Sequence, residues 1–212
     1  MKKSAFNLIL ISLLLTCSFS VAQKRDSLPP SKWNHNLLAG LYIFKDDFFV
    51  LPVYQVNKDW LHLEARYNYE NRKTFSAWLG YNFYGGNKFQ YFITPMAGGI
   101  VGETMGIAPG LELDLTFCGF ELYSESEYVF DLQDNEDNFY YNWTDFSYSP
   151  LDWLCFGLSV QRTKLYQTEL DFQRGIFVGG SYRWFGMNVY TFNLFWDDPY
   201  LVVTLSASFP EE

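Results

Sequence analysis

Apolar and polar residues alternate at every second position through most of this chain. Between Leu61 and Glu70, one series of positions is apolar or aromatic, and the other carries histidine, asparagine or charged residues. From Leu154 to Gln161, Leu, Phe and Val interleave in the same way with Cys, Gly, Ser and Gln. A period of two is typical of a β-strand with one apolar and one polar face. We therefore predict that the chain is built almost entirely of such strands.

The alternation predicts twelve strands and, without the first strand and one neighbour, an alternative count of ten. The predicted strands span residues 37–44, 48–57, 60–70, 74–84, 88–100, 107–117, 120–130, 139–148, 152–163, 172–184, 187–196 and 199–209. Tight turns are predicted at 57–59, 85–87, 118–119, 149–151 and near 185–186. The other connections include the longest ones, at 101–106, 131–138 and 164–171. Short turns at one end and longer loops at the other are typical of membrane β-barrels.

Two of the tight turns also predict which residues pair across neighbouring strands. A two-residue turn at 118–119 and a three-residue turn at 85–87 each set the register of a hairpin. The expected pairs are Phe117 with Phe120, Glu112 with Glu125, and Phe83 with Phe89. In each pair both residues lie on the same face, so the turns and the alternation agree.

The first 22 residues are predicted to be a secretory signal peptide. Lys2 and Lys3 precede an apolar run at 8–15, which is too short to span a bilayer as a helix. Small residues before Ala22 predict cleavage after that position. Lipidation of Cys17, in a segment that resembles a lipobox, is an alternative.

The composition suits a membrane barrel better than a soluble domain. Aromatic residues make up 21% of the chain, and no apolar run beyond the signal is long enough for a membrane-spanning helix. We expect a flexible periplasmic lead-in at 23–36 and one barrel domain at 37–212, because no linker interrupts the later residues. Acidic residues number 24 against 15 basic ones, which argues against nucleic-acid binding. Cys118 and Cys155 are expected to be free thiols.

Together these features resemble the small outer-membrane β-barrel proteins of bacteria. The resemblance covers nearly the whole mature chain and is one of pattern. It implies an all-β fold, a single antiparallel up-and-down transmembrane β-barrel in the bacterial outer membrane, with its apolar faces toward lipid. The last predicted strand reaches an aromatic residue, Phe209, as is common in that class, but Pro210, Glu211 and Glu212 follow it.

Polar residues on the inward faces are the candidate functional residues. The alternation places inside the barrel His62, Glu64, Arg66, Asn68, Glu112, Asp114, Glu121, Glu125, Glu127, Gln161, Gln173 and Arg183. The hairpin at 107–130 directs five of these carboxylates inward, and Glu112 opposite Glu125 needs a cation, a shared proton or an arginine nearby. In one hypothesis, Arg66 and Arg183 pair with the carboxylates and plug the lumen. In two others, the carboxylates line a passage that favours cations or bind a divalent ion.

The sequence predicts a protein that acts without catalysis. We expect a narrow solute pore that leans toward cations, or a structural envelope protein. Its expected partners are outer-membrane lipid and small solutes or cations, and no protein partner, cofactor or metal motif is recognised. An alternative is a soluble secreted or periplasmic barrel with reversed faces that binds an apolar ligand. A third hypothesis, a barrel-embedded lipid or peptide hydrolase, would depend on His62 or Glu125.

Overall fold

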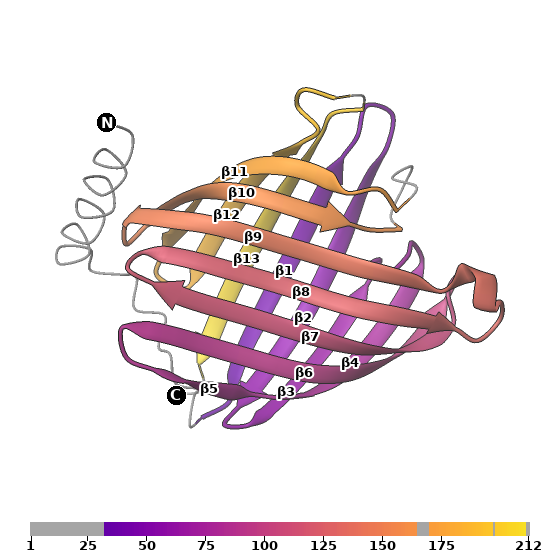
Figure 1. Ribbon diagram of the computed structural model, residues 1–212, viewed down its shortest axis with the longest axis horizontal. Coiled ribbons are helices and arrows are strands. Elements are labelled where there is room, and N and C mark those ends of the chain that lie inside the picture. Colours follow the sequence, from indigo (N-terminus) through magenta and orange to yellow (C-terminus); the bar gives the residue numbers. More distant parts are fainter. Residues whose placement is uncertain (1–31, 165–169, 197, 211–212) are drawn as a thin grey trace, which may run out of the picture.

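The strands of this protein close into one antiparallel barrel (Figure 1). The structure is a computed structural model that describes residues 32–164, 170–196 and 198–210. Its strands are β1 (Asn34–Ile43), β2 (Phe48–Lys58), β3 (Leu61–Tyr67), β4 (Thr74–Tyr81), β5 (Phe83–Gly86), β6 (Phe89–Gly102), β7 (Gly106–Phe117), β8 (Phe120–Asp131), β9 (Phe139–Leu151), β10 (Leu154–Arg162), β11 (Gln173–Tyr182), β12 (Phe185–Phe192) and β13 (Tyr200–Pro210). A short 3-10 helix, η1 (Asn135–Asp137), lies in the connection between β8 and β9. Strands that are neighbours in the chain pair with each other, except that β4 and β5 both pair with β6, and β1 pairs with β13.

The thirteen strand segments make a barrel of twelve strands, because β4 and β5 are two parts of one strand. Both pair with β6 in one continuous register, from Thr74 opposite Gly102 to Gly86 opposite Gln90. The break falls at the buried Asn82. Since β3 begins at Leu61, the residues after Asn82 extend beyond the end of β3 and pair with β6 alone. The predicted twelve-stranded antiparallel barrel is thus confirmed.

The predicted register is confirmed in one hairpin and wrong in another. Phe117 pairs with Phe120 and Glu112 with Glu125, as the turn at 118–119 predicts. Phe83, however, pairs with Ile93 and not with Phe89. Because the shift is an even number of residues, every side chain of that hairpin keeps its predicted face.

Several strand ends also differ from the prediction. β1 begins at Asn34, within the expected lead-in, and β3 ends at Tyr67 instead of residue 70. The turns predicted at 149–151 and near 185–186 are displaced, because β9 continues to Leu151 and β12 begins at Phe185. Positive-φ residues such as Arg183 set the true turns, and alternation alone does not reveal them.

The outer face of the barrel is apolar and the inner face is mixed. Large exposed side chains such as Phe156, Leu158 and Val178 point outward around the wall. Inside, glycines make room for large rings: a Cβ atom at Gly98 would lie 2.4 Å from the indole of Trp78, and one at Gly110 would lie 2.9 Å from it. The apolar face therefore points outward, as the alternation and the aromatic content predict for a barrel in lipid.

Some predictions lie outside the described residues. These are the signal peptide, cleavage after Ala22, the lipidation alternative at Cys17 and most of the lead-in. Within the described part of the chain, no helix is long and apolar enough to cross a membrane. The thiol of Cys155 is free as expected, whereas Cys118, in the turn between β7 and β8, is disulfide-bonded, which corrects the expectation of two free thiols.

Candidate functional site

A buried arginine lies at the centre of the lumen. Arg66, on the inward face of β3, is 1% exposed. Its Nη2 atom lies 2.8 Å from Glu64 Oε2 and 2.6 Å from Glu125 Oε1, and its Nη1 atom lies 2.9 Å from Glu127 Oε2. A fourth carboxylate, Glu70, lies 3.8 Å from Nη1. One guanidinium thus joins β3 to β8 across the inside of the barrel.

The connection between β3 and β4 folds into the lumen and covers this arginine. The chain turns at Asn68, which has a φ of 57°, and the following Tyr69 and Glu70 are buried. The Tyr69 hydroxyl donates to Glu125 Oε2 at 2.6 Å. Arg66 stacks between two rings, 4.3 Å from the centre of Tyr69 and 4.5 Å from that of Trp78. The loop therefore closes the space above the guanidinium.

Glu70 is the loop residue that joins the charge network, which consists of Arg66 and the carboxylates that contact it. It accepts hydrogen bonds at Oε1 from Ser76 Oγ at 2.5 Å and from Trp78 Nε1 at 3.2 Å. Burial raises the pKa of the Glu70 carboxyl, while Arg66 and these hydrogen bonds act in the opposite direction. Glu70 Oε2 is buried and makes no hydrogen bond to any described residue.

Carboxylates outnumber cations in this part of the lumen. Glu64, Glu70, Glu112, Glu125 and Glu127 are each at most 8% exposed. All of them except Glu112 contact the guanidinium of Arg66. Among the described residues, Arg66 Nε and Glu127 Oε1 are also buried without a hydrogen-bond partner. Burying an unpaired ionised carboxylate costs several kcal/mol. Protons, bound cations or water must compensate part of this negative charge.

His62, Glu64 and Glu112 form a second group beside Arg66. His62 Nδ1 lies 2.9 Å from Asn57 Oδ1, and His62 Nε2 lies 3.4 Å from Glu64 Oε2. Gln55 Nε2 donates to both Glu64 Oε1 and Glu112 Oε1, at 3.3 and 3.2 Å. One potential ligand atom from each of His62, Glu64 and Glu112 lies within 4.8 Å of the others.

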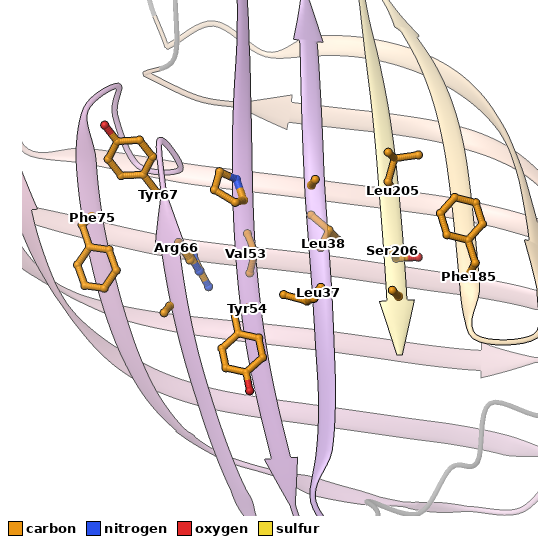
Figure 2. A pocket seen from close by; sticks show the side chains of 14 residues that line it. Leu37, Leu38, Val53, Tyr54, Arg66, Tyr67, Phe75, Phe185, Leu205 and Ser206 are labelled. Carbon is orange, nitrogen blue, oxygen red and sulfur yellow. The ribbon is translucent and has the colours of Figure 1, made fainter. Parts of the chain in front are cut away.

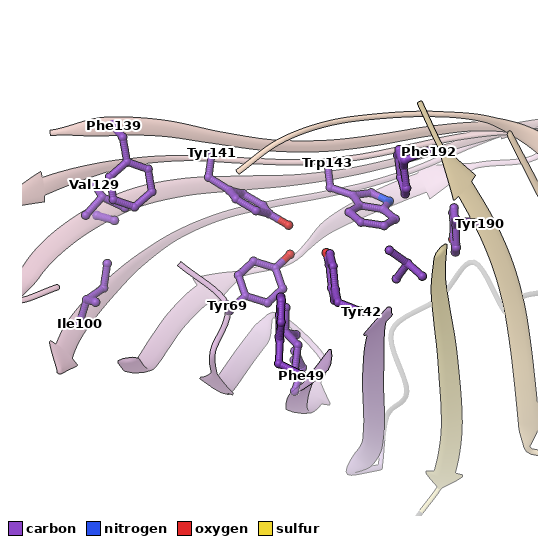
Figure 3. Close-up of a cluster of buried hydrophobic side chains, with 14 of the residues drawn as sticks. Tyr42, Phe49, Tyr69, Ile100, Val129, Phe139, Tyr141, Trp143, Tyr190 and Phe192 are labelled. Carbon is purple, nitrogen blue, oxygen red and sulfur yellow. The ribbon is translucent and has the colours of Figure 1, made fainter. Parts of the chain in front are cut away.

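Aromatic side chains fill the lumen next to Arg66 and its carboxylates. Figure 3 shows Tyr42, Phe49 and Tyr69 rising from one wall toward Tyr141 and Trp143 on the other. The ring centres of Tyr69 and Tyr141 are 5.0 Å apart, and those of Tyr42 and Phe49 are 4.8 Å apart. All five rings are buried. Tyr69 therefore joins the charge network to the aromatic cluster.

Gln161 and Gln173 are both buried, and Gln161 bonds the aromatic cluster. Gln161, on β10, accepts at Oε1 a hydrogen bond of 3.2 Å from the Tyr42 hydroxyl, and its amide donates to the Tyr200 hydroxyl. Gln173, at the start of β11, donates to the Asp171 carbonyl at 3.2 Å and accepts from the Asn193 amide.

The lumen is more open at the end with the short turns. Asp114 and Glu121, near the turn between β7 and β8, are half-buried, as are Asn188 and Thr204 on β12 and β13. We call this region the vestibule. Along β7 the inward positions run from Asp114 in the vestibule to Glu112 beside His62.

The structure brings most of the predicted inward residues together, with two corrections. His62, Glu64, Arg66, Glu112, Glu125, Glu127, Gln161 and Gln173 are buried, and Asp114 and Glu121 are half-buried. Asn68 is not in the lumen wall, because β3 ends before it; its side chain bonds the Val50 carbonyl and the Lys73 amide. Arg183 is exposed in the turn between β11 and β12, over the ring of Tyr182, so it neutralises no lumen carboxylate.

Sequence reasoning missed several lumen residues. Tyr69 escaped because the alternation placed it on the outward face, and a loop that folds inward breaks that alternation. Glu70 lies on the inward series of the alternation but was not among the candidates. Asp145 also lies inside, where its carboxylate accepts hydrogen bonds from Ser159 Oγ at 2.5 Å and Tyr190 Oη at 2.9 Å. Asp145 lies opposite Tyr123 on β8, and the alternation along β9 could have identified it as an inward residue.

A depression of about 480 Å³ lies on the outer wall, over β1 to β4 and β12 to β13. Small side chains at Ala39, Pro52 and Ala65 form its floor, between larger ones such as Tyr54 and Phe75. Figure 2 shows Tyr54 and Phe75 on the near side of the wall and Arg66 behind the strands. The depression is therefore apolar and separate from the lumen.

No protein-family model matches the sequence, and the comparison with curated proteins found no match. Among solved structures, the chain is similar to a KdgM porin, with 12% identity and a TM-score of 0.55 over 83% of this chain and 99% of that one. Its fold is that of a porin barrel. The outer membrane protein Omp33 of Acinetobacter baumannii is 13% identical, with a TM-score of 0.46 over 88% of this chain and 100% of that one.

The interior of this barrel differs from that of an open channel. Charged and aromatic side chains from opposite walls meet at the level of Arg66. His62 Nδ1 lies next to Asn57 and His62 Nε2 next to Glu64, and no serine is among the hydrogen-bond partners of His62 in the described residues, so the geometry offers no serine nucleophile for it to activate.

Proposed function

We propose that this protein is an integral outer-membrane β-barrel whose lumen is closed by its own side chains, and that its role in the envelope is structural. The main observation in favour of a closed lumen is the burial of its residues: Arg66, Glu127 and Gln161 are 1%, 2% and 0% exposed. A water-filled channel would leave such residues wet, as in porins with an aqueous lumen. A twelve-stranded barrel is narrow enough for long side chains to meet across it.

The orientation of the barrel faces supports a membrane location. Exposed apolar residues such as Phe156, Leu158, Ile176 and Val178 cover neighbouring strands on the outside. Contiguous apolar surface of this extent is unfavourable in water and favourable in lipid. The similarity to a KdgM porin in fold agrees with this location. A soluble barrel for an apolar ligand would need its apolar face inward and its polar face outward.

A second candidate function is a gated passage that favours cations. The carboxylate excess around Arg66 is the observation that favours it, together with the acidic residues Asp114 and Glu121 of the vestibule. Conduction would require the loop with Tyr69 and Glu70 to leave the lumen. Opening would then expose Glu112 and Glu125 to passing ions and favour positive charge.

Planar-bilayer recording of the refolded mature protein, under a salt gradient, distinguishes the two functions. A closed structural barrel is silent, although heat modifiability in detergent gels shows that it has folded. A gated passage gives discrete steps with a reversal potential that favours cations. The double variant Glu112→Gln/Glu125→Gln should then lose this preference, and unchanged selectivity would contradict an acid-lined passage.

Fractionation tests the location separately. The protein should stay with outer membranes after carbonate washing, and its release into the soluble fraction would contradict the proposal. Because this measurement needs no conductance, a silent protein in the bilayer does not decide it.

A further inference from the structure

Three potential metal ligands converge on one point of the lumen. His62 and Glu64 come from β3, and Glu112 comes from β7. All three are at least nine-tenths buried, with 1%, 5% and 8% of their surfaces exposed. Gly80 on β4 permits their approach, because a Cβ atom there would lie 2.8 Å from Thr94 Cγ2 and 3.2 Å from His62 Cβ. The strands between β3 and β7 therefore leave space for the imidazole.

A chain of hydrogen bonds fixes the orientation of the imidazole. The Thr94 hydroxyl donates to Asn82 Oδ1 at 2.8 Å, and Asn82 Nδ2 donates to Asn57 Oδ1 at 3.1 Å. Asn57 Oδ1 is therefore an acceptor, so His62 Nδ1, 2.9 Å away, must donate to it. In the neutral ring, His62 Nε2 then carries the lone pair that a metal binds.

The groups around that lone pair are acceptors. His62 Nε2 faces Glu64 Oε2 at 3.4 Å, so a lone pair meets a carboxylate oxygen. Among the described residues, the only hydrogen-bond donor to Glu112 is Gln55, which reaches Oε1 and leaves Oε2 without a partner. Arg66 contacts Glu64 and does not contact Glu112. A positive group between His62 and Glu112 would satisfy all three acceptors.

We propose that His62 Nε2, Glu64 and Glu112 bind a divalent transition-metal ion such as Zn²⁺. An imidazole nitrogen with two carboxylates suits Zn²⁺, whereas Ca²⁺ and Mg²⁺ prefer oxygen ligands alone. Tetrahedral bonds of about 2.1 Å place ligand atoms about 3.4 Å apart. The most distant pair, within 4.8 Å now, need approach by no more than about 1.4 Å.

The ion would also relieve the carboxylate excess of the lumen, and three protein ligands leave a coordination position for water. The half-buried Asp114 lies between the site and the open end, so the vestibule is the route of entry. This inference goes beyond the proposed function, because it concerns a resident ion and holds for a closed or a conducting barrel.

Zn²⁺ binding to the untagged, refolded, chelator-treated barrel tests the site by calorimetry. We expect one ion per chain, loss of binding in Glu112→Gln, and a weakening of about 10–100-fold in Asn57→Ala, which removes the acceptor for His62 Nδ1. Co²⁺ absorption in the wild type should report nitrogen and oxygen ligation. His35→Gln and Glu121→Gln are matched controls that should bind normally, since neither residue belongs to the site.

Heat modifiability confirms that each variant has folded. Folded wild type that binds no Zn²⁺ would overturn the proposal and leave His62 as an imidazolium paired with Glu64. Equal affinity in the wild type, Glu112→Gln and His62→Gln would also overturn it, because the ion would then bind elsewhere. If Glu112→Gln does not fold, the wild-type stoichiometry and the Asn57→Ala affinity still decide the question.

Discussion

Replacing Arg66 by methionine should destabilise the barrel more than replacing any exposed arginine. Methionine keeps much of the side-chain volume, so little cavity is created. The change removes the guanidinium that contacts Glu64, Glu125 and Glu127. It also removes the cation from between the rings of Tyr69 and Trp78.

The expected loss of unfolding free energy is about 3–5 kcal/mol at neutral pH, the cost of removing one partner from a buried ion pair. Loss of the stacked cation adds up to about 2 kcal/mol where the rings are desolvated. Protonation of the abandoned carboxylates offsets part of the total. We therefore expect the net effect to stay near 3–5 kcal/mol.

Urea unfolding in lipid vesicles, followed by tryptophan fluorescence, measures this loss. Arg183→Met is the matched control, because Arg183 is exposed over Tyr182 and should contribute less than about 1 kcal/mol. In the double variant Arg66→Met/Glu127→Gln, part of the stability should return, since one abandoned carboxylate is neutralised. The coupling energy between the two sites should be about 0.5–3 kcal/mol.

A small effect would refute the argument. If Arg66→Met lies within about 1 kcal/mol of the wild type, the lumen charges are solvated or already neutral, and the network does not hold the barrel closed. An additive double variant would likewise show that Arg66 and Glu127 do not interact in the folded protein.

Three further predictions concern packing, the outer face and pH. Gly98→Ala should destabilise the barrel by about 1–3 kcal/mol, because its Cβ atom would overlap the indole ring of Trp78. Gly99→Ala should be neutral, since a Cβ atom there has nothing within 4 Å. Thermal unfolding of the two variants checks this difference. Leu158→Arg, in mid-strand on the outer wall, should cost about 2–4 kcal/mol in vesicles, and the loop control Leu132→Arg about 0–1; equal effects in the urea assay would contradict lipid contact. Burial raises the pKa of Glu70 in the folded state above its value in the unfolded state. The folded protein therefore holds a proton on Glu70 that the unfolded chain has already released. Its stability falls as the pH rises from about 4, the unfolded pKa, through the folded pKa. Glu70→Gln removes this titration, so the stability of the variant relative to the wild type should increase as the pH rises over the same range. A relative decrease in urea titrations would contradict a raised pKa of Glu70 in the folded state.

The sequence by itself predicted most of the strands and which residues share a face, and its resemblance to outer-membrane barrels predicted the closed barrel. Alternation is a local property: each residue's side depends only on its position along its own strand. For this reason Glu112 could be placed inside and opposite Glu125 without any tertiary information. The even slip of register at Phe83 left the faces unchanged for the same reason.

Only the tertiary structure decided which inward residues meet. Contacts across a lumen depend on how strands are staggered at closure, on turns that reverse early, and on where glycine leaves space. Asn68 ends β3 before residue 70 and sends Tyr69 into the lumen beside Glu70, although the period of two places Tyr69 on the outward face. The same closure brings Glu112 to His62 and leaves Arg183 outside, because barrel geometry, and not sequence spacing, sets distances between strands that do not pair.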